Sequence, residues 1–143
     1  MNKEELMIGD WVYNTQNQQN EQVQEVGSGL VMLAYNDLYE YEEIEPIPLT
    51  KEILEKNGFY LCKADFYHPK PSYIWCMDGK RNDTVIDITL YNPSINGVKV
   101  LVKVQSDPLC GDGVNKIHNC DIEYVHQLQH ALKLCGIRKE IKL

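Results

Sequence analysis

The sequence lacks any long apolar segment. Its longest unbroken apolar run is Leu30–Tyr35, whereas a membrane-spanning helix needs about 20 residues. The segment Met1–Glu5 also lacks the pattern of a secretory leader, because it carries acidic residues where a leader has a basic region followed by an apolar one. We therefore expect a cytoplasmic protein that makes no contact with a membrane.

Paired cysteine motifs are also missing. The chain has five cysteines but no Cys-x-x-Cys spacing, and an odd, unpatterned set favours free thiols in a reducing compartment over a disulfide framework. The Gly-x-Ser-x-Gly, Gly-x-Gly-x-x-Gly and phosphate-loop patterns are absent as well. The common hydrolase and nucleotide-binding motifs are thus excluded, and no cofactor is predicted.

Basic residues are scarce at the start of the chain. Residues 1–48 contain one basic and ten acidic residues, a net charge of −9, whereas the rest of the chain carries +2. This asymmetry predicts two structural halves, a subdomain of residues 1–48 and a second one of residues 49–143. It also argues against nucleic acid as a partner, because phosphate binding requires Lys and Arg.

The first half contains short segments rich in β-branched and aromatic residues, separated by turn-forming residues. These segments predict strands at Trp11–Tyr13, Gln22–Val26, Leu30–Tyr35 and Tyr39–Glu43. Such short strands form a curled antiparallel meander. We expect it to close into a small SH3-like barrel, because closure removes exposed strand edges.

The second half predicts an antiparallel sheet with two helices. Thr50 follows two prolines and is a suitable cap for a short helix that begins at Lys51 and ends at Asn57–Gly58. Asp121 is a candidate cap for the last helix, and alternating residues near the C-terminus predict a final edge strand. Between the helices, strands are expected at Phe59–Lys63, Tyr73–Met77, Thr84–Tyr91 and Val98–Val104. The predicted fold class is therefore α+β.

The register of the two longest strands follows from their apolar pattern. A two-residue turn at Asn96–Gly97 would place Leu90 opposite Lys103 and mix the two faces of the sheet. A longer loop over residues 93–97 places Leu90 opposite Val100. It also places Ile88 opposite Val102 and Ile86 opposite Val104, so the apolar side chains share one face. Burial of these side chains decides the register, since it outweighs any exposed ion pair.

Three strings resemble a family of small uncharacterised proteins of gut bacteria, often encoded in prophages or mobile elements. They are Leu6–Val12 near the N-terminus, the Pro-Ile-Pro-Leu-Thr string of Glu45–Thr50, and the Tyr-Val-His-Gln-Leu-Gln string of Tyr124–Gln129. The resemblance does not cover residues 64–119. It implies a phage or mobile-element setting and no activity or catalytic residue.

Two histidines provide the main candidates for chemistry. His126 and His130 have the spacing of a zinc-protease helix, but Gln127 stands where the general base is needed. No metal is predicted; a site without catalysis would draw on Cys110, His118, Cys120, His126 and His130. A cysteine nucleophile, Cys120 or Cys135 beside His126, is a weaker alternative.

The string around His126 also has a structural interpretation. Val125 and Leu128 fall on the buried face of the expected helix. His126 and Gln129 flank that face, and both carry donors and acceptors that suit backbone groups of a neighbouring strand or linker. We predict that the string docks the helix; as the alternative, His126 and Gln129 form a recognition surface.

The candidate binding residues of the first half are aromatic. Trp11, Tyr13, Tyr39 and Tyr41 lie in an acidic segment and suit Arg and Lys side chains through cation–π contacts and charge steering; as the alternative, these rings fill the core. The sequence favours a non-catalytic accessory or interaction protein whose partner is a protein or peptide with a basic surface. The runner-up is a small metal-binding or cysteine-dependent enzyme.

Overall fold

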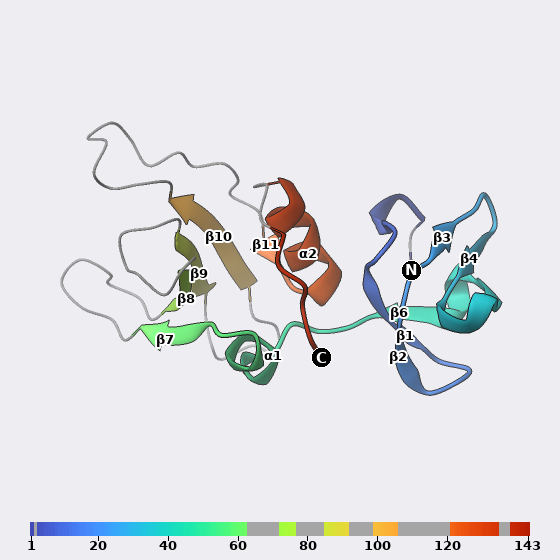
Figure 1. Ribbon diagram of the computed structural model, residues 1–143, viewed down its shortest axis with the longest axis horizontal. Helices are drawn as coiled ribbons and strands as arrows, with labels where there is room; N and C mark the ends of the chain where they lie inside the picture. Colours follow the sequence, from blue (N-terminus) through green and yellow to red (C-terminus); the bar gives the residue numbers. More distant parts are fainter. Residues whose placement is uncertain (2, 63–71, 77–84, 92–98, 106–120, 135–137) are drawn as a thin grey trace.

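The structure is a computed structural model that describes residues 1, 3–62, 72–76, 85–91, 99–105, 121–134 and 138–143. These residues form antiparallel sheets of short strands and two α-helices, an α+β arrangement as predicted (Figure 1). None of the helices among them is long and apolar enough to cross a membrane.

The first half contains two three-stranded antiparallel sheets, ordered β2-β1-β6 and β3-β4-β5. Its strands are β1 (Trp11–Asn14), β2 (Gln19–Gln22), β3 (Glu25–Val26), β4 (Leu30–Met32), β5 (Leu38–Glu40) and β6 (Ile44–Pro46). Three 3-10 turns accompany them: η1 (Lys3–Glu5), η2 (Ala34–Asn36) and η3 (Tyr41–Glu43). No closed barrel is found in this described part of the chain, so the structure supports the sheets but not the predicted closure.

The predicted strand over residues 22–26 is divided in the structure. Gln22 ends β2, and β3 begins at Glu25, so the chain passes from one sheet to the other between them. The second sheet is thereby separated from the first, although both contribute to one hydrophobic cluster, of which Val12, Val31 and Ile44 are members. Two sheets around a common core take the place of one continuous curled sheet.

The second half is built on a five-stranded antiparallel sheet ordered β11-β10-β9-β8-β7. Its strands are β7 (Tyr60–Cys62), β8 (Ser72–Cys76), β9 (Val85–Tyr91), β10 (Lys99–Gln105) and β11 (Asp121–Ile122). In the register of β9 and β10, Leu90 pairs with Val100, Ile88 with Val102 and Ile86 with Val104. The register predicted from the apolar pattern is confirmed; the loop over residues 93–97 lies outside the described residues.

The short helix α1 (Lys51–Lys56) forms as predicted. The Thr50 side chain accepts a hydrogen bond from the backbone N–H of Ile53, which satisfies a donor that the first turn leaves free. Asn57 is the C-cap, and Gly58 adopts the left-handed conformation (φ 79°) that ends the helix. The local cap signals were therefore sufficient to define this element.

The last helix, α2 (Val125–Leu134), begins later than predicted, and Asp121 does not cap it. Asp121 instead lies in β11 and pairs with Leu101 of β10. The helix start is held by Gln127, whose Oε1 accepts hydrogen bonds from the backbone N–H groups of Glu123 and Tyr124 at 2.8 and 3.2 Å. A side chain inside the first turn thus performs the capping that the sequence predicts for Asp121.

The C-terminal residues form no strand in the described range 138–143, so the predicted edge strand is wrong. Side chains hold this segment in place of a β-ladder. The amide of Asn57 makes two hydrogen bonds to the backbone of Lys142, at 2.7 and 2.8 Å, and the Trp11 indole N–H donates to the Ile141 carbonyl at 2.8 Å. Alternation of apolar and charged residues therefore reflected burial of Ile141, not sheet pairing.

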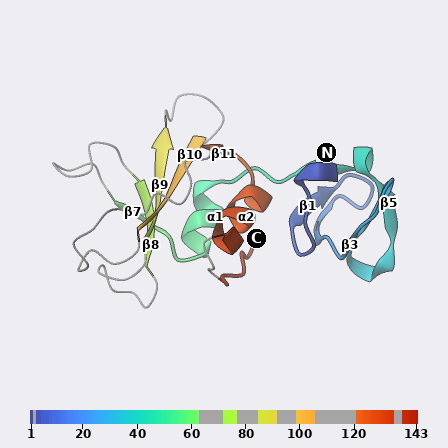
Figure 2. The same cartoon turned by 90° about the horizontal axis from the view of Figure 1, so that it is seen from above.

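Two hydrophobic clusters organise the fold. One belongs to residues 6–44, and the other contains Leu128 and Leu132 of α2, Ile122 of β11 and Leu54 of α1. Trp11 from β1 packs against the second cluster, so the first sheet also touches the core of the other half. Figures 1 and 2 accordingly place α1 and α2 between the five-stranded sheet and the small sheets of the first half.

Truncation of Leu128 tests this core. Its side chain is 0% exposed, and Leu128→Ala should lower the free energy of unfolding by about 2 to 5 kcal/mol through the lost burial and the cavity left behind. Urea denaturation measures the change. Leu134→Ala, at a position 65% exposed on the same helix, is the control and should change stability by less than about 0.5 kcal/mol. Equal effects of the two substitutions would contradict the packing.

Candidate functional site

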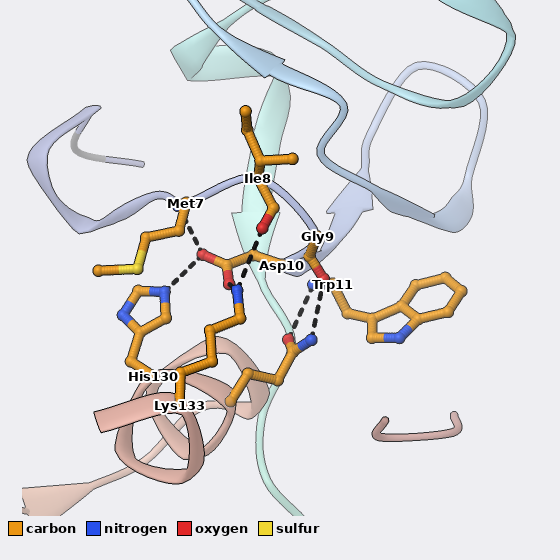
Figure 3. Close-up of polar contacts among 8 residues, drawn as sticks. Met7, Ile8, Gly9, Asp10, Trp11, His130 and Lys133 are labelled. Carbon is orange, nitrogen blue, oxygen red and sulfur yellow. Dashed lines mark hydrogen bonds and ion pairs between the residues drawn. The ribbon is translucent and has the colours of Figure 1, made fainter. Parts of the chain in front are cut away.

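A buried carboxylate lies where the first half meets α2. The Asp10 side chain is 0% exposed and accepts a hydrogen bond from the backbone N–H of Met7 at 2.7 Å. Nε2 of His130 lies 2.7 Å from Oδ2 of Asp10, and Nζ of Lys133 lies 3.9 Å from Oδ1 (Figure 3). Two cationic or proton-bearing side chains of α2 thus approach a single acid contributed by the other half.

Gln129 joins the same two segments through its amide. Its Nε2 donates to the Gly9 carbonyl at 2.9 Å, and its Oε1 accepts from the backbone N–H of Trp11 at 3.0 Å. The side chain therefore pairs with the backbone as a neighbouring strand would. The prediction that Gln129 satisfies backbone groups of a nearby strand is confirmed.

His126 behaves differently from its prediction. Its ring is 1% exposed, and neither ring nitrogen has a hydrogen-bond partner in the described part of the chain, so the predicted hydrogen bonding is wrong for this residue. The ring stacks on Tyr124, with centroids 5.9 Å apart, and meets the edge of His130 at 5.7 Å. Its burial lowers its pKa, and the nearby Asp10 carboxylate partly offsets this while His130 adds to the lowering.

Beside this polar junction lies an open groove of about 620 Å³. It is bordered by residues of both halves and of the C-terminal segment. Its polar and charged lining consists of Gln22, Gln129, Lys133, Arg138, Lys139 and Glu140. We call it the junction groove.

A second surface lies on the outward face of the sheet β3-β4-β5. Cross-strand pairing places Glu25 opposite Met32, Met32 opposite Leu38, and Leu30 opposite Glu40, so all five side chains share that face. Leu30 and Leu38 are 40% and 58% exposed, and they border a hollow of about 330 Å³. We call this surface the outer sheet face.

The turns beside the outer sheet face have unusual backbone geometry. Tyr35 and Asn36 both adopt positive φ, 72° and 65°, and the Tyr35 side chain is 86% exposed. A tyrosine in the left-handed region costs conformational energy, and such strain concentrates at functional positions. At the other end of β4, a Cβ on Gly27 would lie 2.8 Å from the Leu30 carbonyl oxygen, so only glycine fits that turn.

The four predicted aromatic binding residues are not gathered on one surface. Trp11 and Tyr13 pack against the cluster of the second half, whereas Tyr39 packs against the cluster of the first. Tyr41 is 8% exposed, and its hydroxyl donates to the Gly27 carbonyl at 2.8 Å. These rings contribute to packing, and the exposed aromatic side chain of this segment is Tyr35.

The sequence-derived metal set is described only at its two histidines. Cys110, His118, Cys120 and Cys135 lie outside the described residues. Among the residues that the structure does describe, no group of three or more His, Cys, Asp or Glu side chains is placed to hold a metal ion.

The Asp10–His130 contact has the geometry by which an acid orients an imidazole that transfers protons. A nucleophilic role would need a hydroxyl or thiol within reach of that imidazole. In the described part of the chain, no Ser, Thr or Cys side chain is hydrogen-bonded to His130. The contact as seen therefore holds α2 to the first half.

Sequence reasoning missed Asp10, Lys133 and the leucines of the outer sheet face. Asp10 and His130 are 120 residues apart, and no local spacing links them. The outward leucines had a signal in the strand pattern, because Leu30 and Met32 alternate with the buried Val31. Comparison of the chain with known proteins found no match to a family model, to a curated protein or to a solved structure.

Removal of the Gln129 amide should weaken the junction. Gln129→Ala leaves the Gly9 carbonyl and the Trp11 N–H without these partners, and we expect a loss of about 1 to 3 kcal/mol in the free energy of unfolding. Chemical denaturation measures it. Gln24→Ala, at an exposed position, serves as the control and should have little effect. An unchanged stability in Gln129→Ala would show that these hydrogen bonds contribute nothing.

The lowered pKa of His126 makes stability depend on pH. The unfolded chain takes up a proton at His126 near pH 6.5, whereas the folded chain resists it. Stability is therefore fully retained above that pH and falls as the pH drops below it, by up to about 1.4 kcal/mol per pH unit. His126→Gln removes this titration, so its unfolding free energy should fall less steeply between pH 6.5 and 5. Parallel pH profiles for the two proteins would contradict this.

Proposed function

We propose that the protein is a non-catalytic interaction module whose outer sheet face binds a peptide or protein surface. The proposal depends on one observation: the exposed side chains of Leu30 and Leu38 border a hollow on that face, and Glu25 is part of its lining. Exposed apolar side chains with a charged rim are typical of recognition surfaces. Tyr35, with its strained backbone, adds an exposed aromatic side chain in the turn between β4 and β5.

The charge of the outer sheet face indicates which class of partner it binds. Glu25 and Glu40 share the outer sheet face, Asp37 precedes β5 and is also exposed, and residues 1–48 carry a net charge of −9. A partner with apolar anchors flanked by Lys or Arg would fill the hollow and neutralise these acids. We propose this basic, apolar partner in place of one that the four predicted aromatic rings would recognise, because those rings pack against the two hydrophobic clusters or are buried.

The proposed function also includes a fold type for the first half and a biological setting for the protein. We infer that the two small sheets are an opened form of an SH3-like barrel, supported by the pairing of β6 with β1 and by the core that the two sheets share. From the resemblance of the sequence motifs we infer a phage or mobile-element setting, and from the acidic segment Met1–Glu5 we infer that the module acts in the cytoplasm. These two statements are parts of the proposal.

A defined peptide tests the binding. ¹⁵N-labelled protein is titrated with a short synthetic peptide in which paired leucines are flanked by arginines, and backbone amide shifts are followed by NMR. Saturable shifts over residues 25–40 are expected. A matched peptide with glutamates in place of arginines should bind at least about tenfold more weakly.

Variants locate the site. Leu38→Ser and Glu25→Lys should each weaken binding of the arginine peptide at least about tenfold while leaving the thermal midpoint almost unchanged, since both side chains are exposed. Leu134 on α2 is exposed to a similar extent, and the Leu134→Ser variant should bind normally. Equal affinity for the two peptides, or shifts outside residues 25–40, would refute the proposal.

A further inference from the structure

The junction groove has a charge opposite to that of the first half. Three cationic side chains line it, Lys133, Arg138 and Lys139, and a single acid, Glu140, stands among them. The chain as a whole has 21 acidic and 14 basic residues. A basic groove in an acidic protein would attract a small anion locally while the surrounding acids repel a long polyanion.

The three cations differ in what already binds them. Lys133 donates to the Ile8 carbonyl at 3.1 Å and lies near Asp10, so its position is fixed by the junction. Arg138 is exposed at the border of the groove, and its planar guanidinium can bind two oxygens of one oxyanion. The fixed ammonium and the exposed guanidinium together form a two-point site for a charged group.

Lys139 supplies a third cation. Partial burial, and then the neighbouring Lys142 ammonium, lower the pKa of Lys139 below its ordinary value. Burial disfavours its charged form, and a bound anion would restore the balance by favouring that form. A bound anion would therefore raise the pKa of Lys139.

Size limits the class of ligand. The groove volume of about 620 Å³ lies within the range of small-molecule sites and exceeds what a bare phosphate fills. The groove also offers the amide of Gln22 and the exposed apolar side chain of Ile8 for the remainder of a ligand. We propose that the junction groove binds a small molecule bearing a phosphoryl group, held by Lys133, Arg138 and Lys139.

This site is separate from the outer sheet face, so its test is independent of the proposed function. ¹⁵N-labelled full-length protein is titrated at constant ionic strength with inorganic phosphate, with ribose 5-phosphate and with citrate. We expect saturable amide shifts at Gly9, Gln22 and Lys139, with ribose 5-phosphate binding more tightly than inorganic phosphate. Binding of citrate without ribose 5-phosphate would overturn the phosphoryl assignment.

Matched charge variants complete the experiment. Arg138→Gln should weaken ribose 5-phosphate binding at least about tenfold, and Arg138→Lys should restore part of the affinity because it keeps the charge but not the two-point geometry. Lys51→Gln changes the net charge equally at an exposed position of α1 and should leave affinity unchanged. Equal weakening by Arg138→Gln and Lys51→Gln, or absence of shifts at the groove, would refute the proposal.

Discussion

Two amide side chains act as backbone partners and fix the fold: that of Gln129 joins the two halves, and that of Asn57 holds the C-terminal segment against the end of α1. Gln129 pairs with the Gly9 carbonyl and the Trp11 N–H, and Asn57 pairs in the same way with Lys142. A backbone polar group left unpaired in a buried region costs as much as a lost hydrogen bond. These two amides therefore fix where β1 and the C-terminal segment lie, and the junction groove follows from that placement.

The buried Asp10 carboxylate also requires charged or proton-donating partners at this junction. A buried carboxylate is tolerated only when it is paired and hydrogen-bonded, and here His130 and Lys133 of α2 provide the pairing. Because both partners lie on one helix, rotation or displacement of α2 would leave the carboxylate with the hydrogen bond from the Met7 N–H but without a cationic partner in the described part of the chain. The helix is thus positioned by polar contacts on one face and by Leu128 and Leu132 in the core on another.

Local and periodic signals could be predicted from the sequence, and contacts between distant residues could not. The caps of α1 and the β9–β10 register follow from residues close in the chain or from alternation along two strands, and both are confirmed. The barrel closure, the Asp121 cap and the final strand depended on which distant segment pairs with which. No local pattern distinguishes an extended segment held by Asn57 and Trp11 from one held by a sheet.

The two candidate surfaces also differ in whether a local pattern or only the tertiary structure reveals them. The outer sheet face could have been predicted from strand alternation, because Leu30 and Met32 point away from Val31. The aromatic residues that the sequence offers as binding candidates instead contribute to packing. The junction groove could be found only from the tertiary structure, since its lining joins residues 8, 9 and 22 to residues 129, 133 and 138–140. The fold thus separates an acidic, apolar face from a basic groove, and charge selects different ligands for the two: a cationic peptide for the first and a small anion for the second.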